Sequence, residues 1–579
     1  MSFRYELNNK FNFTNVLGSI LESRGISDIR KFLSPDESCL EDESLFDNIG
    51  VAANTLLEHI QNDKDISIVV DCDADGFTSA SMMYQYIEEL IVHFNSKTKL
   101  YYVVHDDKKH GLDKTTVDNL EKQNTDLIII PDAGSNDYDQ HEYLYSKSKE
   151  IIVLDHHECD KYSEYAIVVN NQLSSKITNK AMTGAGVVYK FIRYIDKILK
   201  LNTANQYLDL VSIGMIADSC DLRNLESRYL TLQGLKQIEN DKNNNKLIKS
   251  MISKKSFDMK GKVTITGISF YIAPLINSII RNGTLCEKEL MFKAFINSNE
   301  TYTDKIRGKG EVELSIQDYV VRIAEKCKRK QNKLIKESIE KIEKQIEDYG
   351  LNDNGLLIVS GTDIVDPNYT GLIANKLTSL YQKPCLVLRG DGEKLSGSGR
   401  GFDKKEIKDL RKWCIETRLF ELAEGHPNAF GVKIHKDNTD KLYYLASEVK
   451  DSDELLYFVD GVFTDKTLNK YIIQSVSEHG DIWGTTVSEP VFAIKDININ
   501  TKDIQLMGSK LSTIKFKYKD IEFIKFKSNE EEFNEITKYK NINLTLIGKF
   551  GMNTYNGGST PQIIIENMKY EKGVSKFIF

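Results

Sequence analysis

The sequence has 579 residues, of which 40% are hydrophobic and 28% are charged, and its formal net charge at pH 7 is -8. This composition excludes a disordered chain, and the acidic balance excludes a uniformly basic nucleic-acid binder, although a local groove can still attract phosphates. No apolar stretch approaches the roughly 18 residues that cross a membrane, and the start of the chain does not resemble a signal peptide. With eight cysteines that form no CxxC pair, these features favour a multidomain protein of the reducing cytoplasm.

Apolar runs between Asp65 and Asn171 alternate with helix-compatible stretches. The runs are Ile66 to Val70, Leu100 to Val104, Leu127 to Ile130, Ile151 to Leu154 and Ala166 to Val169. This alternation predicts a parallel β-sheet whose strands are joined by crossover helices. Ligands bind beyond the carboxyl ends of the strands in such a sheet, and Asp71, Asp132 and Asp155 all fall at such ends.

Three aspartates, Asp71, Asp73 and Asp75, follow the first of these runs within the segment DCDADG. Like charges this close raise each other's pKa values, so divalent metal ions or a catalytic acid and base are the usual reasons to keep them together. Further ligands follow later apolar segments: Asp132, Asp155, His156, His157 and, after a predicted buried helix over Tyr207 to Ala217, Asp218. Any one of these alone could be an ordinary strand-end residue, but as a set they predict a two-metal phosphoester-cleaving centre.

The C-terminal half shows three further patterns. A charged, proline-free segment from about Glu311 to Asp348, with isoleucines on one seam at Ile335, Ile339, Ile342 and Ile346, predicts a spacer helix more than ~50 Å long between two lobes. The alternative is a packed bundle helix or a coiled-coil dimer seam. A smaller α/β pattern then runs from Leu356 to the glycine-rich stretches around Ser398 and His426. From about Tyr471, short runs rich in aromatic and β-branched residues predict a small barrel.

Five segments resemble, in the family's order, the DHH phosphoesterase superfamily and in particular the RecJ-type single-strand exonucleases. They are DCDADGFTS at 71–79, IIIPDAG at 128–134, VLDHH at 153–157, TGAGVVYK at 183–190 and IGMIADSCDL at 213–222. Segments at 21–33 and 272–283 are similar to flanking parts of the RecJ catalytic domain, and those at 370–377, 396–401 and 424–431 to its DHHA1 domain. The segments 479–492 and 556–568 resemble the oligonucleotide-binding barrel that separates RecJ from shorter relatives.

The resemblance implies an α/β protein in which a parallel-sheet DHH domain is joined by a long helix to a smaller α/β DHHA1 domain, followed by a C-terminal OB-like β-barrel. The implied divisions are a helical lead-in (1–50), the DHH catalytic domain (51–304), the connecting helix (305–349), the DHHA1 substrate-binding domain (350–437), a linker (438–470) and the OB-like nucleic-acid-binding domain (471–579).

The resemblance also implies a role for each site residue. Two Mn2+ ions, with Mg2+ as the alternative, suit a site of carboxylates and imidazole. Asp73 would serve one ion, Asp75 and His156 the other, and Asp132 and Asp218 would lie between or beside both. Asp71 would be a further ligand or would lie behind the ligands. His157 would contact the substrate phosphate or transfer a proton, and Asp155 would orient the histidines.

The expected strand contacts lie farther along the chain. Ser398 and Arg400 fall in a glycine-flanked loop suited to gripping phosphate, and His426 follows Gly425. Asn277 and Arg281 are expected to line the strand path. The alternatives are an ordinary turn with an exposed Arg400, a turn braced by His426, and a helix cap or a Glu287 pairing for Arg281. Departures from the family pattern at His105, Asp366, Lys376, Gly401 and Glu424 fall among strand contacts and predict a divergent member. The richness in Lys, Asn and Ile indicates an AT-rich genome, as in a phage or a Gram-positive host.

The predicted function is a metal-dependent 5′-to-3′ exonuclease that releases mononucleotides from single-stranded DNA in recombination, repair or phage DNA processing. Single-stranded DNA is the expected partner, with a single-strand-binding protein or a helicase as candidate recruiting proteins. We expect a cytoplasmic monomer with no membrane association. One alternative is a nanoRNase or cyclic-dinucleotide phosphodiesterase, which would not need a barrel that tracks a strand. Another is a noncatalytic DNA-binding scaffold, which the full ligand set disfavours.

Overall fold

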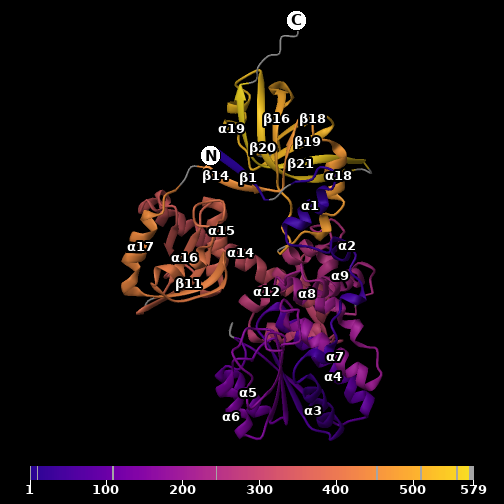
Figure 1. Ribbon diagram of the computed structural model, residues 1–579. Coiled ribbons are helices and arrows are strands. Elements are labelled where there is room, and N and C mark those ends of the chain that lie inside the picture. Colours follow the sequence, from indigo (N-terminus) through magenta and orange to yellow (C-terminus); the bar gives the residue numbers. More distant parts are fainter. Residues whose placement is uncertain are drawn as a thin grey trace. The chain divides into compact units, whose positions relative to one another are not determined.

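The computed structural model describes residues 2–8, 11–106, 110–242, 244–390, 392–451, 454–484, 486–508, 511–555 and 558–572. Residues 485, 556 and 557 of the two barrel motifs lie outside the described residues. The chain divides into two compact units, and Figure 1 labels their helices and strands. The N-terminal unit comprises residues 28–331 and 481–488, and the C-terminal unit comprises residues 1–27, 332–480 and 489–579. Each unit is described by itself.

A five-stranded parallel sheet forms the centre of the N-terminal unit, as the alternating apolar runs predict. Its strands, in the order β3-β2-β4-β5-β6, are β2 (Ile66–Val70), β3 (Leu100–Val104), β4 (Leu127–Pro131), β5 (Glu150–Asp155) and β6 (Ile167–Asn170). Every residue of β2 and β4 is buried, because side chains on both faces of the sheet meet helices. Ile68 and Val70 face one hydrophobic core, and Val69 faces the other.

Helices cover the two faces and extend one of the cores. The helices of the N-terminal unit are α2 (Ile29–Leu33), α3 (Ile49–Gln61), α4 (Ala74–Phe94), α5 (Lys114–Gln123), α6 (Tyr138–Ser146), α7 (Gly184–Leu199), α8 (Leu208–Ala217), α9 (Leu225–Glu239), α10 (Lys246–Lys255), α11 (Ile265–Gly267), α12 (Ala273–Asn282) and α13 (Leu285–Phe295). The larger core joins α3, α4 and α7 to the sheet, whereas α5 and α6 pack on the smaller one. Helix α8 is apolar on all sides and is buried, as the sequence predicts for Tyr207 to Ala217.

Helix α14 (Ile316–Asp348) is continuous from residues of one unit to residues of the other. The connecting helix predicted over 305–349 begins later, because β7 (Thr301–Ile306) and β8 (Gly310–Ser315) form an antiparallel hairpin first. Gly308 and Gly310 supply the positive φ angles of 83° and 78° that its turn requires. The isoleucines of the seam pack within the C-terminal unit against residues of β9 (Leu357–Ser360) and α15 (Thr370–Tyr381). Their hydrophobic contacts are therefore made by residues of the same chain.

Two sheets organise the C-terminal unit. The first has the order β12-β13-β11-β10-β9 and is flanked by α15, α16 and α17; the second is seven-stranded, in the order β15-β16-β20-β21-β19-β18-β17. The remaining elements are β10 (Cys385–Arg389), β11 (Lys394–Arg400), α16 (Leu410–Thr417), β12 (Phe420–His426), β13 (Ala429–His435), α17 (Thr439–Glu448), β14 (Glu454–Val459), β15 (Gly461–Thr464), α18 (Lys470–Ser477), β16 (Phe492–Asn500), β17 (Gln505–Met507), β18 (Thr513–Tyr518), β19 (Ile521–Phe526), α19 (Glu530–Ile536), β20 (Asn541–Tyr555) and β21 (Gly558–Lys572).

The seven-stranded sheet carries the aromatic, β-branched pattern that predicts the barrel. Phe492 stacks on Phe550 with ring centroids 4.0 Å apart, and Phe463 packs beside both. Register shifts interrupt the pairing of β16 with β20 and of β20 with β21; such bulges bend and twist a sheet. Phe463, Phe492 and Phe550 are buried, so these rings form the core of the fold.

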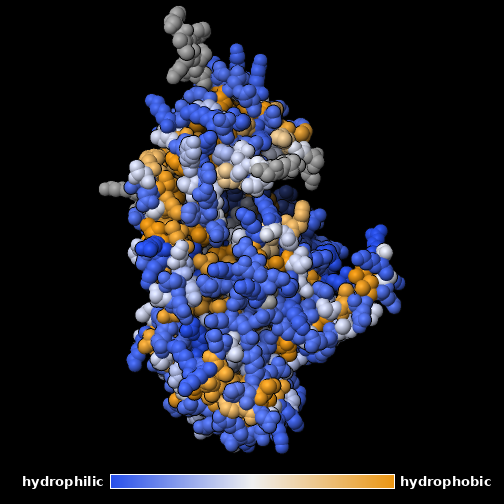
Figure 2. Space-filling model, turned by 90° about the vertical axis from the view of Figure 1, so that its right-hand side faces the viewer, coloured by the Kyte–Doolittle hydropathy of each residue, from blue (hydrophilic) through white to orange (hydrophobic). Residues whose placement is uncertain are grey.

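Two segments differ from their predicted conformation. Residues at the start of the chain, expected within a helical lead-in, form strand β1 (Ser2–Leu7), which pairs in parallel with β14 because alternate side chains such as Phe3 enter a small core. Helix α1 (Val16–Ser23) follows. The predicted linker over 438–470 holds α17, β14 and β15. Among the described residues, no helix combines the length and apolar character needed to cross a membrane. Figure 2 shows a surface on which hydrophobic residues form scattered patches among hydrophilic ones.

The close crossing of α8 and α9 yields a stability prediction. A Cβ atom at Gly234 would lie 2.0 Å from the carbonyl oxygen of Leu208, and a backbone atom cannot move aside. We expect Gly234→Ala to lower the free energy of unfolding by about 1–3 kcal/mol or more. Gly50→Ala on α3 is the matched control, because its nearest neighbour is the Tyr194 hydroxyl, the end of a side chain, at 3.0 Å. Urea denaturation measures both; equal midpoints for the two variants would contradict the prediction.

Candidate metal centre

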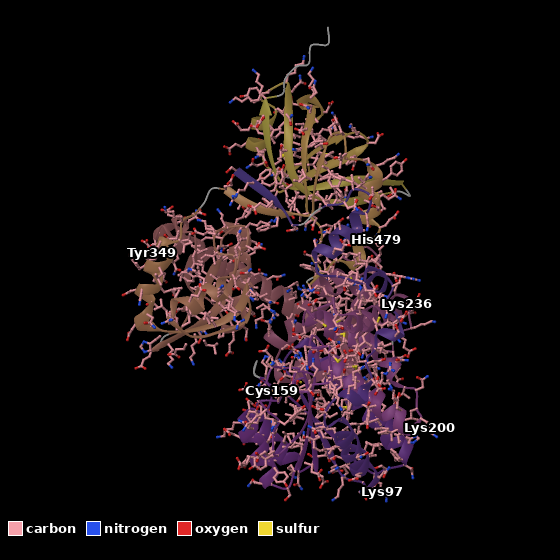
Figure 3. The ribbon with its side chains drawn as sticks, viewed as in Figure 1. Lys97, Cys159, Lys200, Lys236, Tyr349 and His479 are labelled. Atoms are coloured by element: carbon pink, nitrogen blue, oxygen red, sulfur yellow. The ribbon has the colours of Figure 1, made fainter. Side chains whose placement is uncertain are left out.

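The fold brings all eight predicted ligands and histidine partners to one edge of the parallel sheet. Asp71 follows β2, Asp132 follows β4, and Asp155 ends β5. The other members come from the loop after β5, from the start of α4 and from the end of α8: His156, His157, Asp73, Asp75 and Asp218. Their ligand atoms form groups in which all atoms lie within 4.8 Å of one another. Cys159, labelled in Figure 3, marks the loop that carries both histidines.

Helix N-termini hold two of the aspartates. Asp73 is the N-cap of α4, and its side chain accepts a hydrogen bond from Gly76 N at 2.9 Å. Asp75 accepts hydrogen bonds from Gly184 N at 2.8 Å and Ala185 N at 3.1 Å, which are the first two residues of α7. Unpaired N–H groups and the helix dipole favour negative charge at these positions. The α7 amides are site residues that sequence reasoning missed.

Asp132 occupies the centre of the site in a conformation that is uncommon for a residue with a side chain. Its φ angle is 68°, in the left-handed region, and its N–H donates to Leu154 O at 2.8 Å. Its Oδ1 lies 3.2 Å from His156 Nε2, yet this buried oxygen has no hydrogen-bond partner among the described residues. A buried carboxylate oxygen without a donor is costly, and a cation at this point would satisfy it.

The side chain of Asp155 accepts hydrogen bonds from three neighbouring residues. It accepts hydrogen bonds from Ser135 N at 3.0 Å, from His156 N at 2.7 Å and from the His157 ring at Nδ1, 2.8 Å away. Burial by itself would raise the pKa of Asp155, but these bonds and the two nearby imidazoles hold it below its ordinary value. The geometry therefore suits Asp155 to orienting His157.

The two histidines differ in their electrostatics. Burial, followed by the charge of His157, lowers the pKa of His156 to about 4, so His156 is neutral at pH 7 and suited to ligating a metal ion. Burial also opposes the charged form of His157, but the hydrogen bond to Asp155 and its charge raise the pKa of His157 to about 9. His157 therefore carries a positive charge near neutral pH and is half exposed.

Burial and neighbouring negative charge raise the pKa values of four carboxyl groups in the site. Burial and then the charge of Asp73 raise the pKa of Asp75 to about 7, and burial and then Asp75 raise that of Asp218 to about 8. The pKa values of Asp73 and Asp132 are raised by burial and by neighbouring carboxylates. Without a cation the site holds protons at pH 7. Hard oxygens with one neutral imidazole are the donor set of a divalent cation such as Mn2+ or Mg2+.

Asp71 is engaged on both of its oxygens. Oδ1 accepts from Gly111 N at 2.9 Å, and Oδ2 lies 2.6 Å from His110 Nδ1. His105 Nε2 lies 3.9 Å from Oδ1. Sequence reasoning missed His110. It follows β3, so the rule that strand ends converge on one edge would have included it.

The predicted strand-binding residues lie in two places. Asn277 and Arg281 are four residues apart on α12, hence on one face of it, and both are half-buried. Ser398 and Arg400 lie on strand β11, which corrects the predicted loop: Gly397 and Gly399 let neighbouring strands and Phe430 approach closely. Arg400 and His426 both pair with Ala429 of the intervening strand β13. Ser398, Arg400 and His426 therefore gather at one end of that sheet.

Family models match two parts of the chain: the DHH family, N-terminal domain, over residues 65–215, and the RecJ OB domain over residues 459–567. The chain is 42% identical to the putative SPbeta prophage-derived single-strand DNA-specific exonuclease YorK of Bacillus subtilis, with 98% of each chain covered. It is 21% identical to the single-stranded-DNA-specific exonuclease RecJ of Bacillus subtilis, covering 97% of this chain and 69% of that protein. A crystal structure of RecJ from Thermus thermophilus in complex with Mn2+ matches with a TM-score of 0.71 at 17% identity, over 99% of this chain and 80% of the other.

The parallel sheet, with DHH and its partner aspartates at its carboxyl edge, defines a phosphoesterase of the DHH class. Within that class the chain belongs to the RecJ family, because it shares 42% identity over nearly its full length with a relative of that type and carries the RecJ OB domain. The predicted family and fold class are thus confirmed.

The raised carboxylate pKa values yield a prediction about metal and pH. A carboxylate with a raised folded-state pKa favours the folded state below its unfolded value near 3.8, and this contribution is lost as pH rises through about 7 to 8. Because a cation binds the deprotonated site, we expect Mn2+ to raise the melting temperature more at about pH 8 than at about pH 6. Differential scanning fluorimetry measures this, and Asp218→Asn should reduce the effect. An equal Mn2+ shift at both pH values would contradict the prediction.

Proposed function

We propose that this protein is a metal-dependent exonuclease that hydrolyses single-stranded DNA to mononucleotides from the 5′ end. The observation that carries the proposal is the set of ligand side chains around Asp132, whose buried Oδ1 has no hydrogen-bond partner in the part of the chain that the structure describes. The family supports the substrate, since relatives over most of the chain are named as single-strand-DNA-specific exonucleases. The 5′-to-3′ polarity rests on the resemblance to RecJ alone.

Five residues would hold the metal ions: Asp73, Asp75, Asp132, His156 and Asp218. We propose two ions, with Mn2+ preferred and Mg2+ as the alternative. Bound there, the ions would activate water and neutralise charge on the scissile phosphate and the leaving oxygen. The protein's own contribution is to aim the ligands. The α7 amides fix Asp75, and the left-handed turn at Asp132 directs that carboxylate toward His156.

His157 would act on the substrate directly. Its Nδ1 is held by Asp155, which leaves Nε2 of a half-exposed, positively charged ring to donate to a phosphate oxygen or to protonate the leaving oxygen. Asp155 is a positioning residue for this ring. Because Asp155 accepts several bonds already, it has no role in our proposal as a metal ligand.

Each unit by itself offers candidate contacts for the strand. Arg400 with Ser398 and His426 forms a polar group on one sheet end, suited to gripping phosphate, and Asn277 with Arg281 offers a second on α12. We propose that the OB domain holds the incoming strand. We further propose that the protein works in recombination, repair or phage DNA processing. A single-strand-binding protein or a helicase would recruit it, and it would be a cytoplasmic monomer.

Two other functions fit the site less well. A nanoRNase or cyclic-dinucleotide phosphodiesterase would need no strand track, whereas this chain carries a RecJ OB domain. A noncatalytic scaffold would not need the buried, mutually repelling carboxylates, which cost stability unless a cation uses them.

The test is degradation of end-labelled oligonucleotides, single-stranded DNA and RNA, with a 5′-phosphate, a 5′-hydroxyl or a blocked 5′ end, in Mn2+ and in Mg2+. We expect metal-dependent shortening of DNA from the 5′ end. The double variant Asp132→Ala, His156→Ala should lose at least about a thousand-fold in rate, because several kcal/mol of charge stabilisation depends on these ligands. The matched control is Asp118→Ala, His93→Ala, which removes the same residue types from exposed positions on α5 and α4.

The outcomes separate the three functions. Inert long strands with cleaved dinucleotides would replace the proposal by the nanoRNase function, and binding without any cleavage would replace it by the scaffold. Shortening from the 3′ end would overturn the polarity alone.

A further inference from the structure

Two half-exposed imidazoles border the carboxylate cluster, and the proposed mechanism uses only one of them. His157 Nδ1 lies 2.8 Å from Asp155, and His110 Nδ1 lies 2.6 Å from Asp71. The histidine side chains are 50% and 51% exposed, and each partner carboxylate is 1% exposed. Each pair therefore consists of a buried strand-end aspartate that fixes a half-exposed imidazole through its Nδ1.

The two pairs lie on either side of Asp132 in the sheet. Asp71 follows β2 and Asp155 ends β5, and the strand between them is β4, which Asp132 follows. Adjacent strands are about 4.8 Å apart, so the two aspartates are about 10 Å apart across the edge. Asp71 lies with Asp73 and Asp132, and Asp155 and His157 lie with Asp132 and His156, in groups whose ligand atoms are within 4.8 Å of one another, so both pairs border the same cluster.

The surroundings of Asp71 match those of Asp155. Its Oδ1 accepts a hydrogen bond from Gly111 N and its Oδ2 lies 2.6 Å from His110 Nδ1, as Asp155 accepts from backbone N–H groups and from the ring of His157. Cys72 Sγ lies 3.7 Å from His110 Nδ1 and 3.8 Å from its Nε2. Asp71 thus holds His110 in the way that Asp155 holds His157.

We propose that His110 is a second phosphate-contacting residue, whose Nε2 donates to a phosphate oxygen of the nucleotide at the metal centre, and that Asp71 is its positioning residue. The inference rests on the proposed function for its substrate. A phosphodiester has two non-bridging oxygens, and donors from two sides would fix its orientation over Asp132. A charged imidazole offers an N–H at each ring nitrogen, so His110 can bond Asp71 and phosphate together.

The test measures binding separately from catalysis. The affinity of 5′-phosphorylated oligothymidylate and of the dinucleotide pTpT is measured in EDTA by fluorescence anisotropy and by competition, for the wild type and for three variants. We expect His110→Phe to weaken binding about ten-fold or more, because it loses a hydrogen bond to a charged group. His110→Gln, whose amide can reach the position of Nε2, should recover most of the affinity. His93→Gln, an exposed histidine on α4, should leave it unchanged.

Metal binding provides the second readout. Mn2+ stoichiometry, counted by electron paramagnetic resonance, should be the same in the wild type, His110→Phe and Asp71→Asn, since neither residue is a ligand in this proposal. Loss of one Mn2+ ion in either folded variant would overturn it in favour of a metal-ligand role. Unchanged DNA affinity in His110→Phe would overturn it in favour of a purely structural role. A wild type that binds the strands but does not cleave them would instead defeat the proposed exonuclease and leave the His110 comparison intact.

Discussion

The repulsion among buried carboxylates at the edge of the parallel sheet is the constraint on which the rest of the site depends. Burial and then neighbouring carboxylates raise the pKa values of Asp73, Asp75, Asp132 and Asp218, so the protein must supply opposing charge to keep them together. It does so with the first turns of α4 and α7 and with the charged imidazole of His157. Without a cation, the carboxylates whose charge is not balanced in this way hold protons at neutral pH. A metal ion that binds the site would take the place of those protons.

The same constraint explains the unusual backbone around the cluster. Asp132 adopts a left-handed conformation that its neighbours must maintain. A Cβ at Gly184 would lie 2.2 Å from Asp132 Oδ1, and one at Gly214 would lie 2.2 Å from Asp75 Oδ1. Two helices can therefore approach the carboxylates only because these positions lack side chains. The local cost is offset by the two large cores that hold β2, β4, α7 and α8 in place.

Sequence patterns predicted the strands and their ends, which depend on local apolar runs. They missed contacts that form only when the sheets assemble. The apolar runs before Asp71, Asp132 and Asp155 identified strand ends, and strand ends of a parallel sheet must converge. His110 was missed because it lies six residues beyond the end of β3, whereas Asp71, Asp132 and Asp155 lie directly at strand ends. Ser398 and Arg400 were expected in a loop because glycines surround them. In the structure those glycines admit neighbouring strands and an aromatic ring, contacts that only the assembled sheet reveals.

The positions that depart from the family pattern are expected strand contacts, and these differ from the proposed metal ligands in what their loss would cost. Removing a proposed ligand such as Asp75 would leave buried partners uncompensated, at a cost of several kcal/mol. A strand contact such as the one expected at Lys376 or Glu424 lies where water can replace the lost group, and one such contact is worth about 1 kcal/mol. Loss of one proposed strand contact is therefore expected to cost less than loss of one proposed metal ligand. The pairing of Asp71 with His110 lies between these classes, because its carboxylate is buried and its imidazole is open to solvent.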